Sequence, residues 1–169
     1  MYSYLFEEFV AENQDVDFNS PQLWIIHSDK TPPHIGISQN FKFYSLKASG
    51  KDNGLSTSDA FSLFKKKNIE LILVGLDSSA IKKDLAQVYS NYSKAIPFKS
   101  SCTTPILECL KIGESMLLFD LLNYLKSNSL INSVSVYNFQ REILGLGMYN
   151  EQDVALEIEK LQGVKRNKN

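Results

Sequence analysis

With 169 residues, of which 43% are hydrophobic and 22% charged, the chain has an ordinary globular composition and is long enough to bury a hydrophobic core. Its formal net charge of −1 argues against a nucleic-acid-binding protein, which normally carries a basic face. Because the N-terminal segment lacks the basic region and cleavage site of a signal peptide, and no apolar run approaches the roughly 20 residues that cross a bilayer, we expect a cytoplasmic protein without a membrane span.

The spacing of apolar residues predicts both helices and strands along the chain. In chain order we expect a short amphipathic helix over 2–12, strands over 23–26, 34–38 and 41–48, a polar turn over 49–53, a helix from Ser56 or Ser58 to Lys67 with Ala60, Leu63 and Phe64 facing inward, a strand over 71–74, a helix capped by residues 77–79 and carrying residues 81–92, helices over 105–111 and 114–127, a strand over 133–139, and a last helix over 151–162 capped by Asn150. No repeat or linker interrupts this order. It predicts one α+β domain over residues 1–164, with a small antiparallel sheet packed with helices, and a polar tail over 165–169.

The sequence contains two cysteines, Cys102 and Cys109, and two histidines, His27 and His34. Neither a CxxC nor an HxxxH spacing brings them together, so we expect no metal and no cofactor. On one helix the cysteines would lie about 10 Å apart along the axis, which is further than a disulfide allows. Free thiols are typical of a reducing compartment.

A β-hairpin is predicted around His34. A two-residue turn at Gln39-Asn40 would place His34 directly opposite Ser45, with Cβ atoms about 5 Å apart on one face of the sheet. Gly36 would leave free space beside His34, where a substrate or another backbone could approach. The structural alternative is a histidine that bonds a backbone carbonyl.

Cys102 is predicted to lie at the start of a helix, because Pro105 fits only the first helical turn. The unpaired N–H groups and the dipole of a helix start lower the pKa of a thiol and could stabilise an oxyanion. The structural alternative is a small, buried apolar residue, which is the role we expect for Cys109.

The order of these features resembles the circularly permuted branch of the papain-like NlpC-type peptidases and the lecithin retinol acyltransferase group. In that branch the histidine opens a strand of the His-Val-Gly-Ile kind, and the nucleophilic cysteine comes later and opens a helix. Here residues 34–37 read His-Ile-Gly-Ile and residues 101–104 read Ser-Cys-Thr-Thr. The resemblance covers about residues 22–112, and it implies a permuted papain-like architecture.

The resemblance implies that Cys102 is the nucleophile and that His34 is the base that takes its proton. The third polar residue of the family lies on the strand beside the histidine, where the predicted register puts Ser45. A serine orients an imidazole weakly, which leaves open a weakened enzyme, an orienting residue from elsewhere, or a family member without activity. His27 and Thr103 are the auxiliary candidates.

Two functions follow from this resemblance. The first is a thiol hydrolase or acyltransferase that acts on an amide, ester or thioester, with a small molecule or peptide as substrate. The second is a non-catalytic binding or adaptor module on the same fold, in which the cleft serves recognition.

Overall fold

A computed structural model describes residues 1–7, 10–113 and 115–163 of the chain. In chain order its elements are β1 (Tyr2–Leu5), β2 (Val10–Glu12), β3 (Gln22–Ile26), β4 (His34–Gln39), β5 (Lys42–Lys47), β6 (Gly50–Ser56), α1 (Thr57–Lys66), β7 (Leu71–Leu76), the 3-10 helix η1 (Ser78–Ala80), α2 (Leu85–Ser90), α3 (Thr104–Leu110), α4 (Leu118–Ser127), β8 (Ile131–Tyr137), β9 (Gly145–Gly147) and α5 (Glu151–Leu161). The fold class is α+β, as predicted.

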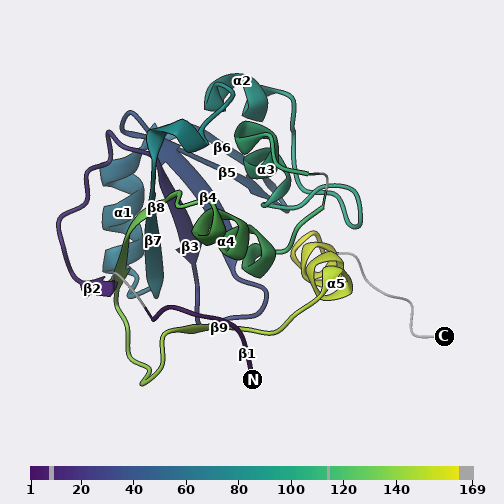
Figure 1. Ribbon diagram of the computed structural model, residues 1–169. Helices are drawn as coiled ribbons and strands as arrows, with labels where there is room; N and C mark the ends of the chain where they lie inside the picture. Colours follow the sequence, from purple (N-terminus) through teal and green to yellow (C-terminus); the bar gives the residue numbers. More distant parts are fainter. Residues whose placement is uncertain (8–9, 114, 164–169) are drawn as a thin grey trace.

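The elements form three layers. Within the described residues, a seven-stranded sheet lies between α1 on one face and α2, α3, α4 and α5 on the other (Figure 1). Each face has its own apolar core. Trp24 and Phe43 belong to the core beneath α1, whereas Ile35 and Leu107 belong to the core beneath the other helices.

The strand order of the large sheet is β2-β8-β7-β3-β4-β5-β6, and every pair is antiparallel except β2 with β8. The strands predicted over 23–26 and 71–74 are β3 and β7, whose residues are all buried. Continuous apolar runs suit these strands because helices cover both faces of the sheet. The expectation of a small sheet is wrong, because segments predicted as a helix and a turn add β2 and β6.

The predicted helix over 2–12 is wrong. The structure has β1 and β2 there, and Glu8 and Phe9 lie outside the described residues. β1 pairs with β9. The side chains of Tyr2 and Leu5 lie against the backbone of Gly145 in β9, where a Cβ atom would come within 2.6 Å of the Tyr2 ring. This distant pairing overrides a helical spacing that is only local.

The predicted turn over 49–53 is also wrong, because β6 begins at Gly50 and pairs with β5 from Lys47↔Gly50 onward. β6 is an edge strand, so its polar side chains remain in contact with water. A polar edge strand has the composition of a turn, and only its pairing with β5 distinguishes the two.

The helix caps agree with the sequence prediction more closely than the segments over 2–12 and 49–53 do. Ser56 caps α1, and Asn150 forms a capping box with Asp153 at the start of α5, both as predicted. The single helix predicted over 81–92 is instead divided into η1, capped by Asp77, and α2, capped by Asp84. The helix predicted from 114 begins at Leu118, with Glu114 outside the described residues.

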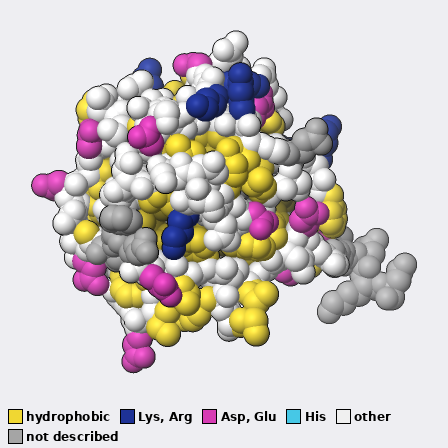
Figure 2. All heavy atoms as spheres, viewed as in Figure 1, with side chains coloured by type: hydrophobic (Ala, Val, Ile, Leu, Met, Phe, Trp, Pro, Cys, Tyr) yellow, Lys and Arg dark blue, Asp and Glu magenta, His cyan; other side chains and the backbone are white. Residues whose placement is uncertain are grey.

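The surface agrees with the composition. The face seen in Figure 2 mixes hydrophobic, acidic and basic side chains, as the net charge of −1 suggests. In the part of the chain that the structure describes, no helix combines the length and the apolar composition needed to cross a membrane. The tail predicted over 165–169 lies outside the described residues.

Candidate functional site

The hairpin that carries His34 turns one residue later than predicted. Its turn is Asn40-Phe41, with φ of 52° and 61°, and Gln39 pairs with Lys42. Positive φ at both central residues matches the right-handed twist of the strands, but it is unusual for phenylalanine. Two distant backbone contacts hold Phe41 in this conformation: its N–H donates to Phe18, and its carbonyl accepts from Thr57.

The predicted pairing of His34 with Ser45 is therefore wrong, because Ser45 pairs with Gly36. The register moves by two residues, so His34, Gly36 and Ser45 still share one face of the sheet. That face is the one that α1 covers. The free space predicted beside Gly36 is filled by the ring of Phe43, which would lie 2.4 Å from a Cβ at Gly36.

Ser45 bonds an acidic residue that the sequence did not single out. Its Oγ donates to Oδ2 of Asp52 at 2.7 Å, and Nζ of Lys47 donates to Oδ1 of the same carboxylate at 2.7 Å. Asp52 was missed because it falls in the segment predicted as a turn. Ser45 and Lys47 lie on the same face of β5 and both contact Asp52 on the neighbouring strand β6. This cross-strand contact can be recognised only once the register of β5 and β6 is known.

His34 opens β4 opposite Ile26, and its Nε2 atom is buried without a hydrogen-bond partner among the described residues. Desolvation lowers the pKa of His34 to about 4; Asp52 opposes this effect, whereas Lys47 and His27 add to it. The imidazole is therefore neutral at pH 7. Among the described residues, a second buried side-chain atom without a partner is the hydroxyl oxygen of Tyr89, in the core of the opposite face.

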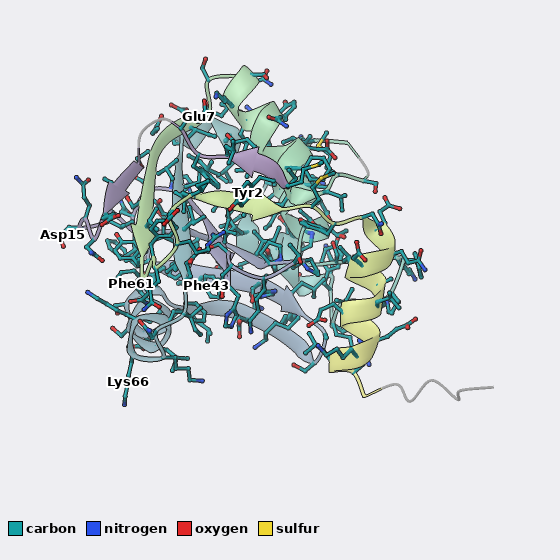
Figure 3. The ribbon with its side chains drawn as sticks, turned by 90° about the horizontal axis from the view of Figure 1, so that it is seen from below. Tyr2, Glu7, Asp15, Phe43, Phe61 and Lys66 are labelled. Atoms are coloured by element: carbon teal, nitrogen blue, oxygen red, sulfur yellow. The ribbon has the colours of Figure 1, made fainter. Side chains whose placement is uncertain are left out.

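A cavity of about 460 Å³, which we call the His34 cavity, lies between the sheet and α1. Its polar lining consists of His27, His34, Ser45, Lys47, Ser49 and Asp52. Most of its apolar lining comes from β5, β6 and α1, namely Phe43, Leu55, Ala60, Leu63 and Phe64; Ile26 of β3, Ala48 and Leu161 of α5 complete it. Figure 3 labels Phe43, from β5, and Phe61, from α1, which both contribute to the core on this side of the sheet.

Two of the apolar side chains that line the cavity are half-exposed. Leu55 and Leu63 are each 47% exposed, which contradicts the prediction that Leu63 faces the core. Ala60 is buried as predicted. Leu63 therefore lines the cavity from its open side and is not part of the close-packed core.

Cys102 lies just before α3, as predicted, and is partly buried. The backbones of Ile35, Cys102 and Thr103 hydrogen-bond its sulfur and favour the thiolate, but desolvation is the larger effect and raises the pKa to about 11. The β4–β5 pairing ends at Gly36↔Ser45, so the Ile35 backbone is available to the sulfur. The lowered thiol pKa expected from the helix start is therefore not supported.

Cys102 and His34 both line a second cavity of about 260 Å³, which we call the Cys102 cavity. Successive strand residues point to opposite faces, so the His34 side chain lies on the α1 face, whereas Cys102 packs with Ile35 against the other core. Nε2 of His34 has no partner, so it accepts no hydrogen bond from the thiol.

The remaining candidates take other roles. His27 has a left-handed backbone, lines both cavities, and has a pKa lowered mainly by burial. Thr103 is the N-terminal boundary residue of α3, and its hydroxyl bonds that of Ser101. Both cysteines are free thiols. Among the described residues, no three His, Cys, Asp or Glu side chains gather where they could hold a metal ion.

The chain matches no protein-family model, no curated protein and no solved structure. Function is therefore inferred from the residues and their geometry.

The reactivity of Cys102 can be measured directly. A pKa of about 11, against 9.0 for an ordinary thiol, leaves about a hundredfold less thiolate at pH 7. In a Cys109→Ser background, we expect iodoacetamide to label Cys102 at least about a hundredfold more slowly than a free cysteine at pH 7. The rate should increase with pH up to about 11 and should not change in His34→Ala. Rapid labelling at pH 7 would contradict this assignment.

Proposed function

We propose that the protein is a binding module that holds a small ligand in the His34 cavity. The observation that carries this proposal is the buried, unpartnered Nε2 of His34 in a residue that lines the cavity. A buried polar atom without a partner costs about 1–3 kcal/mol, so native proteins seldom contain one without a reason. A ligand that bonds the imidazole would remove this cost when it binds.

The chemistry of the cavity supports the proposal. Ligand sites are commonly about 300–1,000 Å³, mostly apolar, with a few polar groups that fix the orientation of the ligand. The His34 cavity, at about 460 Å³, falls in this range, and more of its lining side chains are apolar than polar. The half-exposed Leu55 and Leu63 would gain burial when a ligand binds.

A permuted papain-like architecture is part of this proposal. Its support is the order of elements: the strand that begins with His34, a hairpin partner, a helix, a buried strand, and later Cys102 immediately before α3. The bond between the Ile35 backbone and the sulfur of Cys102 joins these two parts of the chain.

Proton affinities favour binding over nucleophilic catalysis. Transfer of the thiol proton to His34 would move it from a group with a pKa of about 11 to one with a pKa of about 4. A thiolate–imidazolium pair is therefore strongly disfavoured in this geometry.

The second candidate is a thiol hydrolase or acyltransferase that acts through Cys102. It is favoured by the three backbone groups on the sulfur, which could stabilise an oxyanion, and by the cavity that Cys102 shares with His34. Labelling of Cys102 that is fast at pH 7 and slows in His34→Ala would replace the binding module with this enzyme.

Binding can be tested with Nile red, an uncharged apolar dye whose fluorescence increases on leaving water. We expect saturable binding of one dye molecule per chain. Leu63→Asp should weaken it about tenfold, because it replaces an apolar lining side chain with a charge. Ser62→Asp is the matched control: it adds the same charge on α1, at an exposed position that is not part of the cavity lining, and should change the Kd less than twofold.

Absence of saturable binding, or equal affinities for the Leu63→Asp and Ser62→Asp variants, would overturn the proposed function. Urea unfolding of both variants checks that they are folded, and we expect this because both side chains are exposed.

A further inference from the structure

The charged groups that line the His34 cavity already satisfy one another. Asp52 and Lys47 are its charged residues, and they form an ion pair at 2.7 Å. The second carboxylate oxygen of Asp52 accepts from Ser45. The charges of Lys47 and Asp52 thus offset each other.

The two histidines in the lining add no charge at neutral pH. His34 is kept neutral by burial, and the pKa of His27 is lowered by burial and by Lys30. A charged group brought into this cavity would lose water without gaining a counter-charge, which is strongly unfavourable.

The imidazole of His34 nevertheless offers one hydrogen bond. In a neutral imidazole, Nε2 is a donor in one tautomer and an acceptor in the other. A hydroxyl group can both donate and accept, so it matches either tautomer. A carbonyl or an ammonium group matches only one of them.

Resting on the proposed function, we propose that the ligand of the His34 cavity is an uncharged amphipathic alcohol or phenol. Its hydroxyl bonds Nε2 of His34, and its apolar body lies against Phe43, Leu55, Leu63 and Phe64. The Lys47–Asp52 ion pair, in which the two charges already offset each other, disfavours carboxylates and amines as ligands.

Four probes of nearly equal shape test this ligand class at pH 7.5 by displacement of Nile red: benzyl alcohol, ethylbenzene, benzoate and benzylammonium. We expect benzyl alcohol to bind at least about tenfold more tightly than either ion. In His34→Phe, the ratio of the Kd of benzyl alcohol to that of ethylbenzene should increase about fivefold, because one net hydrogen bond is lost. His34→Gln, which keeps a hydrogen-bonding group, should retain most of the wild-type ratio.

Tighter binding of benzoate or benzylammonium than of benzyl alcohol would overturn this ligand class and leave the binding function standing. The same holds if His34→Phe leaves the alcohol-to-ethylbenzene ratio unchanged. If Nile red itself does not bind, the proposed function fails together with the inference.

Discussion

Acidification from pH 7 to pH 4 is expected to lower the free energy of unfolding by about 3 kcal/mol through His34 alone. The unfolded chain takes up a proton at this residue below its ordinary pKa of 6.5, whereas the folded protein resists protonation until about pH 4 because the imidazole is desolvated. The folded pKa is the lower one, so the stabilisation is fully present above pH 6.5. It decreases as the pH falls towards 4.

Urea unfolding at pH 7, 5.5 and 4.5 measures this effect. Carboxylates also titrate near pH 4.5. The informative quantity is therefore the difference in the pH-dependent loss of unfolding free energy between the wild type and His34→Gln, whose side chain cannot be protonated. We expect the variant to lose less stability on acidification than the wild type. His27→Gln is the control and should differ less, because its side chain is only partly buried. An identical pH dependence in His34→Gln and the wild type would show that the imidazole is not desolvated in the folded protein.

Gly36→Ala is the second change with a large expected effect, a loss of about 3 kcal/mol of stability. The new Cβ would lie 2.4 Å from Cε2 of Phe43 and 2.9 Å from the carbonyl oxygen of Tyr44. The carbonyl belongs to the paired backbone of β5 and cannot rotate away. The Phe43 ring would have to move, and it packs on Trp24 and lines the His34 cavity.

Two readouts follow from that displacement. Urea unfolding should show the loss of stability, and the fluorescence of Trp24, the single tryptophan, should change in the folded state. Gly113→Ala is the matched control, because its nearest neighbour would be Cε of Met116 at an ordinary 3.8 Å. A Gly36→Ala variant as stable as Gly113→Ala would mean that Phe43 does not fill the space beside Gly36.

Short-range patterns in the sequence determined the buried strands and the helix starts. β3 and β7 can be predicted from continuous apolar runs, because helices cover both faces of the sheet and bury all residues of these strands. The starts of α1 and α5 can be predicted from Ser56 and Asn150, because the capping hydrogen bond joins residues only three positions apart in the sequence. The position of Cys102 before α3 follows in the same way from Pro105.

Tertiary contacts decided what depends on distant partners. β1, β2 and β6 are strands because β9, β8 and β5 supply their hydrogen bonds, and the hairpin register follows from the contacts of Phe41 with Phe18 and Thr57. Charge at the candidate site was decided in the same way. A helix start lowers the pKa of a thiol, and it can be predicted from the sequence. At Cys102 desolvation outweighs this effect, and desolvation also keeps His34 neutral. Desolvation arises from side chains that only folding brings together.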